Sequence, residues 1–234
     1  MDSKDYRLKL FNEYIENAEY IHEKEYDTLK YMASKWVLDI NELRELRKAF
    51  IEGDRHYESK KYKINFDVDE EEYILSYENF EINLKKDNYE TFLMTTLDIL
   101  EDILPLGSVV DLRKDVYGDK IDIDKIDNLR MVITYRYIIK EDDGYYFPYA
   151  GVVYPIGMLF DNSKVFHFTA PLIEKVVMRG YSDEADDVFS YYMKQEMIVK
   201  EGLHTYGYMS NEKVEDIITK LEIEKMRRWT WRAS

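Results

Sequence analysis

The sequence predicts an α+β fold, in which a small, strongly bent antiparallel sheet or open barrel of about five strands is flanked by an N-terminal helical and β region and by C-terminal helices. Apolar residues recur at steps of three and four near both ends of the chain, which is typical of one buried face of a helix. In the middle they alternate with polar residues or form short runs between turn residues, which is typical of strands. The changes of period divide the chain into residues 1–103, 104–181 and 182–234.

The first region begins with three predicted helices. Phe11, Ile15 and their neighbours form one apolar stripe between residues 5 and 18. A second helix is predicted over Tyr26–Val37. A third begins after Asp39 and ends before Gly53, because glycine is the favoured residue just past a helix end.

Strands follow the third helix. Apolar side chains alternate with polar ones over residues 62–66, 73–75 and 80–84, a period of two. Glu78-Asn79 is a plausible turn between the last two strands. Helical spacing then returns over Thr91–Ile103, and Pro105 is expected to end this helix.

The middle region contains the strands of the predicted sheet or barrel. They cover Gly107–Leu112, Met131–Ile139, Tyr145–Tyr154, Val165–Phe168 and Ile173–Arg179. The residues Asp142-Asp143-Gly144 suit the hairpin turn before the third of them.

The last region returns to helices. Ser182-Asp183-Glu184 is a helix-start signature, because an Asp or Ser side chain can accept the free backbone N–H groups there. Gly202 is expected to stop this helix. A final helix is predicted to start at Ser210-Asn211 and to end in a segment rich in arginine and tryptophan.

Three segments of the chain together resemble a known family. Leu104–Val110, Tyr149–Gly157 and Val176–Glu184 are, in this order, similar to the family catalogued as domain of unknown function 4176 of Gram-positive bacteria. The resemblance covers about residues 104–190. Its members look like partners of LXG-type toxins exported by type VII secretion, so the resemblance implies a role in protein binding. The prolines and glycines of these segments are expected to be structural: Pro105, Gly107, Gly151, Pro155 and Gly180.

The chain departs from the family pattern by an insertion. Asp115–Asn128 stands where the family has a tight turn, and it alternates isoleucine with acidic residues. An extended arm or edge strand and a solvated loop are both compatible with this pattern. We expect this insertion and residues 1–52 to choose the partner, because both lie outside the shared motif.

Composition limits the classes of function. The 234 residues include 48 Asp and Glu against 33 Lys and Arg, a net charge of −15, and such a surface repels nucleic acid. Cysteine is absent, which excludes disulfides, thiol nucleophiles and zinc–thiolate sites. The N-terminus has no apolar core like that of a signal peptide, and no run has the length of a membrane span. We therefore expect a cytoplasmic protein without a transmembrane segment.

Motifs of catalysis and of metal or cofactor binding are missing. No glycine-rich phosphate loop, nucleophile elbow or paired histidine motif is present. The acidic runs 67–72 and 119–124 lack the spacing of a calcium loop and suit a solvated loop or strand edge. His167 lies between two phenylalanines of a predicted strand, where its side chain points away from both rings. We expect no catalytic, cofactor-binding or metal-binding residues, so the protein is not expected to be an enzyme.

Two groups of residues are candidates for protein binding. The first is Tyr145, Tyr146, Phe147 and Tyr149, because tyrosine adds apolar area and a polar tip at low entropic cost. The alternative is that these rings lie in the core of the sheet.

The second group is a basic and aromatic segment at the C-terminus of an acidic chain. It contains Arg227, Arg228, Trp229 and Trp231, and it suits an acidic groove or a phospholipid headgroup. The alternative is a helix end with favourable charges and one tryptophan packed on the core.

Three functions remain open from the sequence. The resemblance implies a chaperone or targeting adaptor that binds an LXG toxin, at its C-terminal part, or the secretion machinery. The net charge of −15 fits equally well an immunity protein that neutralises such a toxin. A structural or regulatory domain without a toxin partner is the third hypothesis. The sequence does not indicate the oligomeric state.

Overall fold

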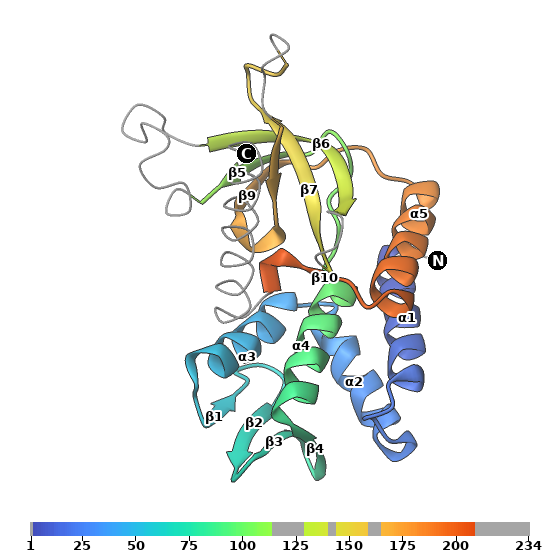
Figure 1. Cartoon of the computed structure of the whole chain (residues 1–234), viewed down its shortest axis with the longest axis vertical. Helices are drawn as coiled ribbons and strands as arrows, with labels where there is room; N and C mark the ends of the chain where they lie inside the picture. Colours follow the sequence, from blue (N-terminus) through green and yellow to red (C-terminus); the bar gives the residue numbers. More distant parts are fainter. Residues whose placement is uncertain (1, 114–128, 140–143, 159–164, 209–234) are drawn as a thin grey trace, which may run out of the picture.

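The computed structural model describes residues 2–113, 129–139, 144–158 and 165–208. They form an α+β fold with two sheets, and the larger sheet is open and does not close into a barrel, so the predicted fold class is confirmed. The small sheet lies at one end of the long axis and the larger sheet at the other, with helices between and beside them (Figure 1).

The bounds of the elements are as follows. The helices are α1 (Ser3–Asn17), α2 (Tyr26–Trp36), α3 (Ile40–Glu52), α4 (Lys86–Leu100) and α5 (Glu184–Lys194). The strands of the small sheet are β1 (His56–Glu58), β2 (Ile64–Asp69), β3 (Glu72–Tyr77) and β4 (Phe80–Lys85). Those of the larger sheet are β5 (Val109–Leu112), β6 (Leu129–Ile139), β7 (Tyr145–Val153), β8 (Phe166–Phe168), β9 (Ile173–Met178) and β10 (His204–Thr205).

The first three helices begin and end close to the predicted positions. Asp2 caps α1, because its side chain accepts the backbone N–H of Asp5 and the Asp5 side chain accepts that of Asp2. Gly53 ends α3 in the left-handed conformation, with a φ of 78°. A glycine adopts this conformation without the steric cost that a side chain brings. The end of α3 could therefore be predicted from the sequence.

The small sheet is antiparallel, in the order β1-β2-β3-β4. The predicted turn Glu78-Asn79 is confirmed, because Tyr77 pairs with Phe80 across it. Strand β1 was not predicted; its three residues carry no alternation long enough to detect.

Helix α4 corrects the prediction at both ends. It begins at Lys86 rather than Thr91, because its first turn is polar apart from the fully buried Tyr89. It ends at Leu100, so Pro105 does not end it. Instead, Arg7 donates to the carbonyl of Leu100 at 2.6 Å, and the chain leaves the helix at Glu101 with extended backbone angles. Basic side chains satisfy the last carbonyls where the helix stops.

The larger sheet has the order β10-β7-β6-β5-β9, and β8 also pairs with β7. All five predicted strands are present, and every pair among them is antiparallel. The sixth strand, β10, was not predicted and runs parallel to β7. The hairpin residues Asp142 and Asp143 and the insertion 115–128 lie outside the described residues.

The C-terminal helix starts as predicted. The Asp183 side chain accepts the backbone N–H of Asp186 at 3.1 Å and caps α5. A π-helical segment, Gln195–Lys200, continues α5, and Gly202 follows it with a φ of 64°. The predicted final helix from Ser210 onwards lies outside the described residues.

One hydrophobic cluster joins the helices to both sheets. It contains Phe11 of α1, Phe66 of β2, Phe92 of α4 and Met131 of β6, all completely buried. Helix α4 is buried along nearly its whole length, and in Figure 1 it runs from the small sheet up to the larger one. The core is therefore shared between the N-terminal region and the larger sheet.

Candidate functional site

The first and third of the three segments that carry the family resemblance interlock. The Ser108 hydroxyl donates to the carbonyl of Pro105 at 2.7 Å and accepts the backbone N–H of Gly180 at 2.9 Å. A Cβ at Gly180 would lie 2.1 Å from the carbonyl oxygen of Leu106, so the two backbones approach more closely than any side chain allows. Ser108 therefore holds this junction together.

The second segment meets the first through Tyr149. The Tyr149 hydroxyl accepts the backbone N–H of Leu104 at 3.1 Å, inside the core. Gly151 lies against β6, where a Cβ would be 2.3 Å from the carbonyl oxygen of Val132. Gly107 has a φ of 77° and donates its N–H to Ile133. The glycines of the segments thus lie at close backbone approaches and at a tight turn.

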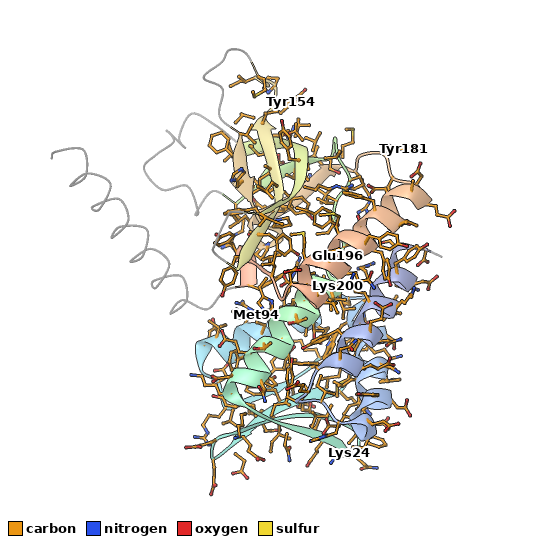
Figure 2. All side chains as sticks on the ribbon, turned by 45° about the vertical axis from the view of Figure 1, so that its right-hand side comes forward. Lys24, Met94, Tyr154, Tyr181, Glu196 and Lys200 are labelled. Atoms are coloured by element: carbon orange, nitrogen blue, oxygen red, sulfur yellow. The ribbon has the colours of Figure 1, made fainter. Side chains whose placement is uncertain are left out.

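Pro155 lies in the exposed turn that follows β7. The peptide bond between Tyr154 and Pro155 is cis. Tyr154 is exposed at the end of the molecule that carries the larger sheet, far from Lys24 at the opposite end (Figure 2).

Strand β9 presents an exposed apolar edge. It is the last strand of the sheet order and pairs with β5 among the described strands. Five consecutive residues of β9, from Glu174 to Met178, are exposed. Val176, Val177 and Met178 have exposed fractions of 44%, 40% and 54%. The pairing with β5 steps from Val176 to Met178 past Val177, so the regular alternation is interrupted here and all three apolar side chains are exposed.

Contacts at both ends hold β9 in place. Before the strand, the carbonyl of Leu172 accepts the backbone N–H of Arg113 at 2.9 Å. After it, Arg179 forms an ion pair with Asp102 at 2.8 Å, next to the contact between Gly180 and Ser108. The edge is therefore ordered before any partner binds.

A charged cleft lies between α1, α5 and the residues that follow α4. Its lining includes Arg7, Asp102, Arg179, Asp186 and Lys194. Two of its acidic groups are paired: Asp102 contacts Arg179, and the Asp186 carboxylate accepts from Arg136 at 3.3 Å. These ion pairs join the larger sheet to the segment after α4 and to α5.

Lys194 is the buried cation of this cleft. Its ammonium group donates to the carbonyls of Ile99, at 2.9 Å, and Glu101 at the end of α4. Burial, together with the nearby charge of Arg7, lowers the pKa of Lys194 to about 7. A lysine with this pKa can attack carbonyl compounds, but its side chain is almost fully covered and two backbone acceptors hold it.

A second buried polar contact joins α4 to β10. The carboxylate of Asp98 accepts from the Thr205 hydroxyl at 2.8 Å and from the Thr205 N–H at 3.2 Å. His204 Nδ1 lies 3.2 Å from the same carboxylate. A histidine beside a carboxylate is one part of a hydrolytic site, but among the described residues no Ser or Thr hydroxyl forms a hydrogen bond with this ring. The group serves to anchor β10.

The described part of the chain shows neither a metal cluster nor a helix that could span a membrane. In it, no three His, Asp or Glu residues gather in a way that could hold a metal ion. No described helix combines the length and the apolar character needed to cross a membrane.

Comparison with known proteins gives a family match. Residues 103–189 match the family model described as Domain of unknown function (DUF4176). The resemblance to this family is confirmed. The matched DUF4176 segment contains strands β5 to β9 and the first half of α5. No curated protein and no solved structure matches the chain.

The structure divides the four aromatic candidates of the DUF4176 segment into two pairs. Tyr146 and Tyr149 are 1% exposed, so their rings belong to the core and are not available to a partner. Tyr145 and Phe147 are half-buried and pack against Tyr206, with ring centroids 5.5 and 4.3 Å apart. The alternation of the strand explains the difference only in part. Tyr149 has the same place in the alternation as Tyr145 and Phe147, but it stacks on Phe168 of the neighbouring strand β8, with ring centroids 5.5 Å apart.

The C-terminal candidates Arg227, Arg228, Trp229 and Trp231 lie outside the described residues. The exposed residues Val176, Val177 and Met178 were predicted only as part of a strand. Periodicity cannot tell an edge strand from a central one, because pairing partners are distant in sequence. The available signal was the lack of alternation in this run after the charged pair Glu174-Lys175.

Proposed function

We propose that the protein is a non-catalytic binding partner of a secreted toxin, acting as a cytoplasmic chaperone or targeting adaptor for an LXG-type toxin in type VII secretion. Residues 103–189 match the DUF4176 model, and the resemblance to this family implies such a role. The observation that carries the proposal is the ordered, exposed apolar edge of that segment at Val176–Met178. Exposed apolar surface of this kind marks protein interaction sites.

The charge of the chain also supports a polypeptide partner. At a net charge of −15, the protein attracts basic segments and repels nucleic acid. The charged cleft and the Asp98 group are explained by packing and anchoring, so neither requires a substrate. Binding by surface complementarity needs only an apolar centre with a polar rim.

Deletion of the gene in its host tests this proposal. The expected result is loss of export of the partner toxin while the producing cell grows normally. Affinity purification of the native protein, followed by mass spectrometry, should recover the toxin. If the deletion strain is poisoned instead, the protein is an immunity protein, for which the acidic charge is the favourable observation. Normal export and normal growth together would contradict both roles.

A further inference from the structure

The edge of β9 differs along its length in how it is guarded against pairing with another strand. Natural edge strands are protected by bulges and by charged residues. The first half of β9 has both: Glu174 and Lys175 are charged, and the pairing with β5 steps from Lys175 to Ile173 past Glu174. The second half has a bulge at Val177 but no charge, and three aliphatic residues are exposed in succession.

The backbone of this half is ready to accept a strand. Its ends are fixed by the contact between Ser108 and Gly180 and by the ion pair between Asp102 and Arg179. A strand that is already extended and rigid loses little conformational entropy when another chain pairs with it. Main-chain hydrogen bonds to an edge supply affinity, and alternate side chains supply specificity.

Charge determines which kind of segment can pair with this edge. On the strand itself the exposed charges balance, because Glu174 is followed by Lys175, and Arg179 after the strand is paired with Asp102. The net charge of −15 of the whole chain therefore decides which segment is attracted. It favours a basic strand over an acidic one, and it disfavours a second copy of this acidic chain.

We propose that Val176–Met178 bind an extended segment of the partner, rich in aliphatic residues and lysine or arginine, as an added strand of the larger sheet. This inference rests on the proposed function and specifies its binding mode. The occupant adds beside β9, at the edge opposite β5.

The test uses the full-length protein and the partner polypeptide recovered with it, expressed separately. Hydrogen–deuterium exchange should show slower exchange of the backbone amides of Val176–Met178 in the complex than in the free protein. Val177→Glu should weaken binding about tenfold or more, because it places a charge in a desolvated centre. Raising the salt concentration should also weaken binding, because screening reduces the attraction of a basic segment.

A matched control comes from the other sheet. Phe80 of β4 is also on an edge strand and is 57% exposed, so Phe80→Glu changes an equivalent surface without touching the DUF4176 segment. It should bind like the unaltered protein, and thermal unfolding should show that both variants are folded. As a second probe, Val177→Pro removes the backbone N–H of the residue that the pairing with β5 skips, without adding charge.

The outcomes separate this inference from the proposed function. If the unaltered protein binds the toxin but β9 exchange is unchanged and both Val177 variants bind normally, the added-strand inference is wrong and the proposed function stands. Equal weakening by Phe80→Glu would also overturn it, because the effect would then be one of charge alone. If the unaltered protein binds no toxin, both proposals are refuted.

Discussion

At the scale of single residues, Gly180 is where the backbone leaves no room for a side chain. A Cβ there would lie 2.1 Å from the Leu106 carbonyl oxygen and 2.9 Å from the Ser108 nitrogen. We predict that Gly180→Ala lowers the free energy of unfolding by about 1–3 kcal/mol, the usual cost of overpacking. Chemical denaturation measures it. Ser182→Ala, at an exposed position in the same connection, is the control and should change stability by no more than about 0.5 kcal/mol.

Lys194 gives a pH dependence to the stability. Its pKa is about 7 in the folded protein, against 10.5 for the exposed side chain. Between these values the unfolded chain binds the proton and the folded chain does not, so the free energy of unfolding rises with pH from about 7 upward. The slope from one such group is at most about 1.4 kcal/mol per pH unit.

The variant Lys194→Met removes this contribution. We predict that the difference in free energy of unfolding between the unaltered protein and Lys194→Met shifts in favour of the unaltered protein as the pH rises from 7 to 9.5. Urea denaturation at several pH values measures it, and comparing the two proteins cancels the other titrating groups. Parallel profiles for the two proteins would mean that Lys194 keeps its ordinary pKa in the fold.

At the scale of elements, β10 depends on α4. The two residues of β10 pair with β7, and the Asp98 carboxylate accepts two hydrogen bonds from Thr205. We predict that Asp98→Ala lowers the free energy of unfolding by about 2–4 kcal/mol, because it leaves the buried N–H and hydroxyl of Thr205 without acceptors. Hydrogen exchange should show faster exchange at His204 and Thr205 than in the unaltered protein. Glu196→Ala, at an exposed position of the π-helical segment, should leave these amides unchanged.

The elements also show what the sequence could predict. Helix α3 and the β3–β4 turn were predicted because Gly53 and Glu78-Asn79 act locally on the backbone. The end of α4 was predicted wrongly because its carbonyls are satisfied by Arg7 and Lys194, far along the chain. Strand β10 and the exposed edge of β9 were missed for the same reason: the local periodicity of a segment does not depend on which distant strand pairs with it.

The candidate site follows the same rule. The glycines of the family segments were predicted to be structural, and Gly151 and Gly180 lie where two backbones nearly touch. The aromatic run of β7 was not resolved by pattern alone, because Tyr149 has the same place in the alternation as Tyr145 and Phe147 but is buried against Phe168 of β8, a strand distant in sequence. Exposure, and with it the capacity to bind, depends on how strands are ordered in the sheet.

At the scale of the whole molecule, the N-terminal helices and the DUF4176 segment share one core. Leu10, Phe11 and Ile15 of α1 are at most 1% exposed, and α1 packs against α4 and α5. Burying one such side chain stabilises the folded state by about 1.5–3 kcal/mol relative to leaving it exposed. The free energy of unfolding of a protein domain is only about 5–15 kcal/mol. Losing the buried residues of α1 to α3 therefore removes more stabilisation than the whole free energy of unfolding.

We therefore predict that a chain starting at Gly53 does not fold, although it retains the whole DUF4176 segment. Near-ultraviolet circular dichroism of this shortened chain should lack the signal of fixed aromatic rings, while the full chain should show one cooperative thermal transition. A folded shortened chain would show that the larger sheet is an independent domain. If the prediction holds, a truncated chain that fails to bind the proposed partner does so because it is unfolded. The expectation that residues 1–52 choose the partner must then be tested with surface substitutions on α1 to α3 instead.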